Sequence, residues 1–66
     1  MVKYTKSKEK WYLTDDDGFE ISISRKFNLK QAYYLFLLGK EGYFVKELSD
    51  KEKQKIEETI KELSDE

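Results

Sequence analysis

LTDDDGFEIS, residues 13–22, decides the fold because it sets three aspartates and a glycine between two segments of alternating polarity. After the glycine, every second residue is apolar: Phe19, Ile21 and Ile23. Trp11 and Leu13 continue the same alternation before the aspartates. A period of two is typical of strands with one buried face. The stretch therefore predicts a β-hairpin whose turn holds the aspartates.

The length of the hairpin loop follows from keeping the apolar residues on one face. A loop of residues 16–18 pairs Leu13 with Ile21. A two-residue loop would instead pair Leu13 with the polar Ser22, and a slip of one residue moves a whole strand to the wrong face. Three-residue loops are closed by a residue with left-handed backbone, a conformation that Gly18 adopts at little cost. We therefore predict the three-residue loop.

The three aspartates raise the question of a calcium loop or a catalytic acid pair. An EF-hand loop needs acidic ligands at positions one, three and five, glycine at six and glutamate at twelve. With Gly18 as the sixth residue, the first is Leu13 and the twelfth is Ser24. A catalytic carboxylate pair needs burial to separate its two pKa values, which a hairpin tip does not supply. We expect a structural turn and no metal site.

The first eight residues allow two interpretations. Val2 and Tyr4 alternate with polar residues and would form a third strand. Lysines recur through the same region and beyond it, at positions 3, 6, 8 and 10, which would equally suit a flexible basic arm. Both interpretations stay open for residues 1–8.

A first helix begins after Asn28, with Gln31 placed to complete a capping box. It ends at Gly39 or Gly42, since glycine commonly follows the last helical turn. Its apolar residues fall on two sides, with Leu29, Ala32, Tyr33 and Phe36 on one and Tyr34, Leu35 and Leu38 on the other. A helix that is apolar nearly all round must be covered twice. We predict a central helix between the hairpin and a second helix.

The second helix begins after Ser49, again with a capping box, completed by Glu52. Its apolar stripe is narrow and consists of Ile56, Ile60 and Leu63. Residues 64–66 are expected to fray. Between the helices, residues 43–45 are expected to run extended over the core. The predicted fold class is α+β: an antiparallel hairpin, with the third strand left open, followed by two helices in one ββαα domain of residues 1–66.

Composition excludes several functions. The chain has no histidine and no cysteine, so the commonest general base and the thiolate metal ligands are missing. We expect no enzyme activity and no cofactor. Thirteen basic and 14 acidic residues nearly cancel, so no strong attraction to nucleic acid or to a membrane surface is expected. The longest apolar run, residues 32–38, is too short to span a bilayer. We expect a soluble, cytoplasmic protein.

One family resemblance starts at Phe19, where an alternating strand is followed by a helix, a glycine-containing loop and a serine-capped helix. This order resembles the ribbon-helix-helix family, dimeric repressors whose paired strands enter the major groove of DNA. The resemblance implies four groove-facing residues: Glu20, Ser22, Ser24 and Lys26. A DNA-binding repressor is therefore the alternative function.

A protein without catalytic groups or phosphate-binding loops is expected to function by binding another molecule through its surface. Its short, lysine- and glutamate-rich composition resembles that of accessory proteins of bacteriophages and other mobile elements, which implies binding and inhibition of a host protein. We predict a protein-interaction module with a protein partner of unknown identity, and self-association as a homodimer with two-fold symmetry. The predicted partner-binding residues are Tyr34, Leu35, Leu38, Tyr43 and Phe44.

Overall fold

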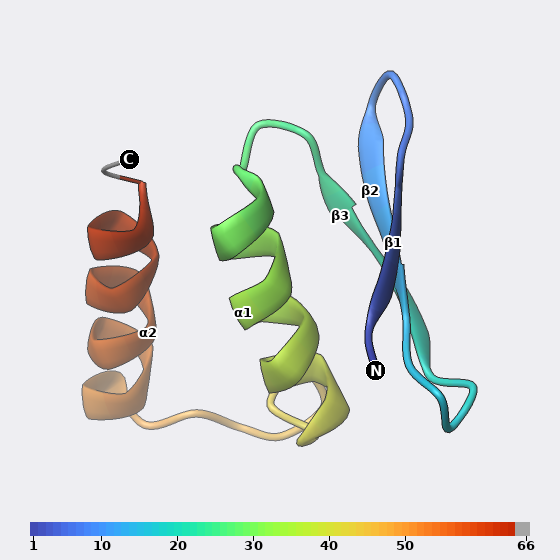
Figure 1. Ribbon diagram of the computed structural model, residues 1–66. Helices are drawn as coiled ribbons and strands as arrows, with labels where there is room; N and C mark the ends of the chain where they lie inside the picture. Colours follow the sequence, from blue (N-terminus) through green and yellow to red (C-terminus); the bar gives the residue numbers. More distant parts are fainter. Residues whose placement is uncertain (65–66) are drawn as a thin grey trace.

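The computed structural model describes residues 1–64 as a sheet of three strands followed by two helices. The elements are β1 (Lys3–Lys6), β2 (Lys10–Thr14), β3 (Glu20–Ser24), α1 (Leu29–Lys40) and α2 (Asp50–Leu63). They form three layers, with α1 between the sheet and α2 (Figure 1). The predicted α+β fold class and the central position of the first helix are confirmed. Neither described helix is both long and apolar enough to cross a membrane.

The sheet is an antiparallel meander in the order β1-β2-β3. Leu13 pairs with Ile21 and Trp11 pairs with Ile23, which confirms the predicted register. The question left open at the amino terminus is settled in favour of a strand, because Lys3–Lys6 pair with residues 11–14 of β2. The backbone N–H of Ser7 donates to the carbonyl of Lys10 at 2.9 Å and closes this first hairpin.

The aspartate loop has the predicted turn geometry. The N–H of Asp15 donates to the carbonyl of Phe19 at 2.9 Å, and the N–H of Gly18 donates to the carbonyl of Asp15 at 3.0 Å. Gly18 has a φ of +86°, in the left-handed region. The Asp15 carboxylate also accepts a hydrogen bond from the backbone N–H of Asp17 at 3.1 Å. An aspartate that bonds its own turn in this way stabilises the loop.

The core lies between α1 and the two strands that α1 covers. Its buried members are Trp11, Leu13, Ile23, Ala32 and Phe36. Phe36 packs against Phe19 with ring centroids 5.4 Å apart. The indole N–H of Trp11 donates to the carbonyl of Phe27 at 2.9 Å, so the polar atom of this large side chain is satisfied. The helix therefore packs on β2 and β3 and leaves β1 outside the core.

Gly42, rather than Gly39, ends α1. Gly42 has a φ of +86°, and its N–H donates to the carbonyl of Gly39 at 3.1 Å. The N–H of Tyr43 donates to the carbonyl of Leu38 at 3.0 Å, which completes a Schellman motif. Because this motif leads into further turns through residue 45, the expected extended segment at residues 43–45 is wrong.

The two predicted capping boxes are present, and the first of them also holds α2. Asn28 and Gln31 exchange side-chain-to-backbone hydrogen bonds of 2.8 Å at the start of α1. Their amide nitrogens donate to the carbonyls of Leu63 and Ile60, again at 2.8 Å. Carbonyls in the last turn of a helix have no partner within it, so these bonds fix the end of α2. Ser64 is the C-cap of α2, and the rest of the predicted frayed end, residues 65–66, lies outside the described residues.

Candidate interaction site: a groove between β1 and α1

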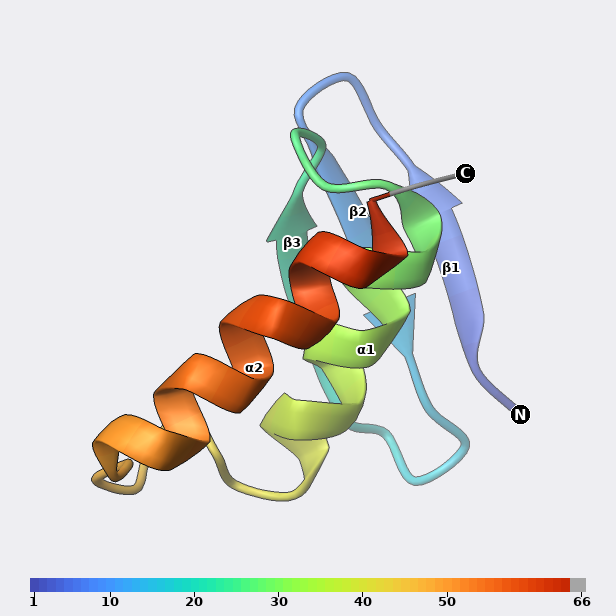
Figure 2. The ribbon, with the colours of Figure 1, turned by 90° about the vertical axis from the view of Figure 1, so that its left-hand side faces the viewer.

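The helices cover two strands of the sheet and leave the third uncovered. Figure 2 shows β1 lying beyond both helices at one side of the molecule. Every residue of β1 is exposed, whereas Trp11 and Leu13 of the neighbouring β2 are buried. The flank of α1 and the uncovered strand therefore face each other across a gap floored by β2.

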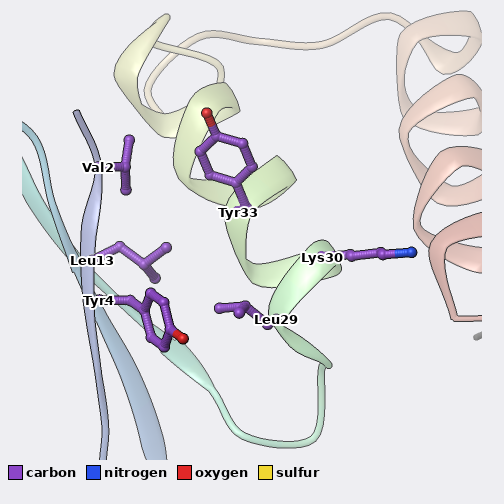
Figure 3. A pocket seen from close by; sticks show the side chains of 6 residues that line it. All are labelled: Val2, Tyr4, Leu13, Leu29, Lys30 and Tyr33. Carbon is purple, nitrogen blue, oxygen red and sulfur yellow. The ribbon is translucent and has the colours of Figure 1, made fainter.

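This gap is an apolar groove of about 350 Å³. It is lined by Val2, Tyr4, Leu13, Leu29, Lys30 and Tyr33. In Figure 3 the apolar side chains from β1 and from α1 point toward one another, while Lys30 points away from the groove. Two tyrosines dominate its exposed surface: Tyr4 is 56% exposed and Tyr33 is 46% exposed. Tyrosine is enriched in protein interfaces because its ring adds apolar area and its hydroxyl stays hydrogen-bonded.

Tyr4 is held by its neighbours although it is exposed. Its ring meets that of Trp11 edge-on, with centroids 6.0 Å apart and planes at 68°. Lys6 and Arg25 lie near the same indole at 5.8 and 5.1 Å from its centroid. The guanidinium of Arg25 also donates to the carbonyl of Ser7. These contacts hold the indole, and the edge-on contact with the indole restricts the ring of Tyr4, which reduces the side-chain entropy that a partner would have to remove on binding.

The strand beside the groove is basic. Residues 1–10 contain four lysines and one glutamate. The amino-terminal ammonium of Met1 pairs with Asp16. No carboxylate lines the groove within residues 1–64. A partner segment that carries negative charge would therefore meet complementary charge along β1.

The predicted partner-binding residues do not form one surface. Tyr34, Leu38 and Tyr43 line a second groove of about 480 Å³ between α1 and α2, together with Glu52, Lys55 and Ile56. Leu38 is only 8% exposed there, so little of its surface remains for a partner. Lys46 lies 4.2 Å from the ring centroid of Tyr43 and partly covers it.

The other two predicted residues lie on the sheet side of α1. Leu35 is partly buried and packs against the core. Phe44 is exposed and lies over Gly39, where an added Cβ would come within 2.9 Å of the Phe44 ring. Tyr4 and Tyr33, which line the groove between β1 and α1, are not among the partner-binding residues predicted from the sequence. The alternation of Val2 and Tyr4 with polar residues indicates a strand. It does not indicate which strand of the sheet the helix leaves uncovered.

The aspartate loop is tied to α1 by a lysine. Lys40 pairs with Asp15, and its Nζ lies 3.2 Å from a carboxylate oxygen of Asp17. The hydrogen bond from Lys40 lowers the pKa of Asp15 below its ordinary value, and the same bond raises the pKa of Lys40. In the described part of the chain, no three residues of the metal-ligating types converge. The loop works as a structural connection between the hairpin and the helix.

Three of the four positions implied by the ribbon-helix-helix resemblance lie on the face of the sheet opposite the helices. Glu20, Ser22 and Ser24 alternate with the residues of β3 that face α1, and all three are exposed. Lys26 follows the strand, with its ammonium 5.3 Å from the ring centroid of Phe27. This outer face also carries Lys3, Thr5, Lys10, Tyr12 and Thr14. It is polar and mixed in charge.

Comparisons with known proteins give no further indication of function: no family model, no curated protein and no solved structure matches the chain.

Proposed function

We propose that this chain is a non-catalytic protein-interaction module that binds its partner through the groove between β1 and α1. The observation that carries the proposal is an open apolar groove that is lined by two half-exposed tyrosines, Tyr4 from the sheet and Tyr33 from α1. Exposed apolar surface that is concave and rimmed by polar groups marks interaction sites more often than scattered single residues do.

The chemical inventory supports a binding role over a catalytic one. The chain lacks histidine and cysteine, and general acid–base catalysis would have to rest on carboxylates, lysines or tyrosines. Among residues 1–64, the pKa is lowered for two carboxylates, Asp15 and Glu52. Asp15 is paired with Lys40, and Glu52 accepts a hydrogen bond from the backbone of Ser49 at the helix cap, so both already hold the fold together. Inhibition of a host protein by a mobile-element accessory protein is one use of such a module and remains a prediction.

Selection from a library of random displayed peptides tests this function. We expect peptides that bind the wild-type protein and bind Tyr4→Ser or Tyr33→Ser at least about tenfold more weakly, since aromatic residues at the centre of an interface commonly carry 2 kcal/mol or more. Tyr12→Ser is the matched control, because Tyr12 is 42% exposed on the opposite face of the sheet. Selected peptides that bind all three variants equally would contradict the proposal.

The DNA-binding alternative has one supporting observation, the exposure of Glu20, Ser22 and Ser24 together on one face. Phosphate recognition requires several basic groups, and its affinity falls steeply with salt. That face offers Lys3 in the same row of the sheet as Glu20, and Lys10 opposite Ser24 at the other end of β3. We expect no binding to duplex DNA at roughly 0.15 M salt, and a salt-sensitive gel shift abolished by Lys26→Gln would favour the alternative.

A further inference from the structure

The free edge of β1 presents unpaired backbone groups beside the groove. In an antiparallel ladder, residues that exchange hydrogen bonds alternate with residues whose N–H and C=O point away from the partner strand. The bond from Ser7 to Lys10 makes these two a hydrogen-bonded pair. Counting back along β1, Thr5 and Lys3 turn their backbone groups to β2. Val2, Tyr4 and Lys6 therefore turn theirs outward at the edge of the sheet.

The same three residues place their side chains on the helix side of the sheet. Tyr4 is paired with Leu13, which lies in the core, and Lys6 is paired with Trp11. Side chains alternate between the two faces of a sheet, so Val2 shares that face, and it lines the groove with Tyr4. A strand added to this edge would thus satisfy the backbone of β1 and lay every second side chain along the groove (Figure 3).

We propose that the groove binds an extended, acidic segment of a partner protein, which adds to β1 as a fourth antiparallel strand. This inference rests on the proposed function and specifies its partner. The charge of β1 selects the occupant: Lys3 and Lys6 belong to the strand itself, and Lys8 and Lys10 follow it. Lysines on an edge strand oppose pairing with another copy of the same edge, because like charges then lie side by side. An acidic segment removes that repulsion.

The register predicts the pattern of the bound segment. A residue opposite Lys6 should be acidic, and residues opposite Tyr4 and Val2 should be apolar because they face the groove. Between them, the residue opposite Lys3 lies on the outer face and should also be acidic. Read in the direction of the added strand, the pattern is acid, any residue, apolar, acid, apolar. The probe is the synthetic peptide Gly-Glu-Thr-Val-Glu-Leu-Gly. The control peptide, Gly-Val-Thr-Glu-Leu-Glu-Gly, has the same composition but places its glutamates where the pattern requires apolar residues.

Two substitutions at one position separate the backbone from the charge. Lys6→Gln removes the ammonium and keeps the outward N–H. Lys6→Pro removes both, and an edge strand tolerates proline where the N–H faces solvent. Thr5 is already extended, as a residue before proline must be. In titration calorimetry with the probe peptide, we expect Lys6→Pro to bind at least about fivefold more weakly than Lys6→Gln, the range for one lost hydrogen bond. Circular dichroism must show both variants folded.

N-methylation of the probe peptide tests the backbone hydrogen bonds that the peptide donates to β1. A methyl group on the nitrogen of the valine, which pairs with Tyr4, should abolish measurable binding. A methyl group on the following glutamate nitrogen, which points away from β1, should change the affinity less than about threefold. Equal effects of the two methyl groups would overturn strand addition.

The remaining outcomes identify other occupants. Selected peptides whose binding falls with Tyr33→Ser but equally in Lys6→Gln and Lys6→Pro would leave the proposed function standing and overturn strand addition. Helical chemical shifts in the bound probe would replace the strand with a helix in the groove. Sedimentation of the wild type as a dimer that Lys6→Pro dissociates would show that a second copy occupies the edge.

Discussion

β1 and β2 are neighbours in one sheet, and their paired residues Tyr4 and Leu13 share one face, yet their exposures differ sharply. Leu13 is 1% exposed and Tyr4 is 56% exposed. The difference comes from α1, which packs on β2 and β3 and does not reach β1. The alternation of polar and apolar residues thus specifies a face of the sheet. The position of the helix decides which part of that face belongs to the core and which part stays exposed.

The largest expected difference between the covered strands and β1 is in the stability lost when one aromatic side chain from each region is truncated. Phe36 is fully buried between α1 and the covered strands, so Phe36→Ala should cost about 3–5 kcal/mol of unfolding free energy. Tyr4→Ala removes an exposed ring and should cost less than about 1 kcal/mol. Urea denaturation followed by circular dichroism measures both. Similar losses would mean that β1 contributes to the core.

The two capping boxes allow a smaller and sharper test. Gln31 is buried, completes the box of α1 and donates to Ile60 of α2, so Gln31→Ala should cost about 1–3 kcal/mol by leaving polar groups unsatisfied. Glu52 completes the box of α2 near solvent, where water can replace its hydrogen bond to Ser49, so Glu52→Ala should cost much less than Gln31→Ala. Hydrogen exchange at the end of α2 should accelerate in the first variant only. Faster exchange there in both variants would show that the bond from Gln31 does not hold the helix.

Substitutions in the hairpin loop between β2 and β3 should have the next smaller effect on stability. Gly18 has left-handed backbone and open space around the position of a Cβ, so strain and not a clash decides the effect. Gly18→Ala should cost about 1 kcal/mol, and Gly18→Asn less, since asparagine tolerates this conformation better. Thermal unfolding compares the two. An asparagine variant less stable than the alanine variant would contradict the turn geometry as the cause.

The smallest effect concerns the connection between the aspartate loop and α1. Because the hydrogen bond from Lys40 lowers the pKa of folded Asp15, the folded state binds this proton more weakly than the unfolded state. The connection therefore stabilises the fold above about pH 4, the ordinary range of an aspartate, and is lost as the pH falls through the lowered pKa. Wild type should exceed Lys40→Gln in stability at pH 6, and the difference should shrink at pH 2. A difference independent of pH would show that Lys40 acts through packing.

Local signals in the sequence were sufficient for the starts of both helices and for the register of the hairpin formed by β2 and β3, but they left β1 open between a strand and a flexible arm. Leu13 and Ile21 could share a face only with a three-residue loop, and Gly18 suited its last position. Asn28 and Ser49, each followed by its capping partner, located the starts of both helices. These predictions succeeded because each depends on residues within a few positions of one another.

One failure is local: the Schellman motif at Gly42 redirects the chain into turns, so Tyr43 and Phe44 separate to different sides of α1. The features that were missed depend on tertiary packing. The bonds from Asn28 and Gln31 to the end of α2 join residues about thirty positions apart. The groove at Tyr4 and Tyr33 exists because α1 is centred on β2 and β3, and no local pattern reports that offset.

Mapping backbone amide shifts by NMR tests the central claim most directly. The measurement titrates a peptide selected for binding, as described above, into the 15N-labelled protein. We predict that the largest changes fall on Val2, on the edge strand β1 and on residues 29–33 of α1, which border the open groove. Changes centred on Tyr34, Leu38 and Tyr43 would place the partner between the helices instead, and changes centred on Tyr12 and Ser22 would place it on the outer face of the sheet. Either result would contradict the groove beside β1 as the binding site.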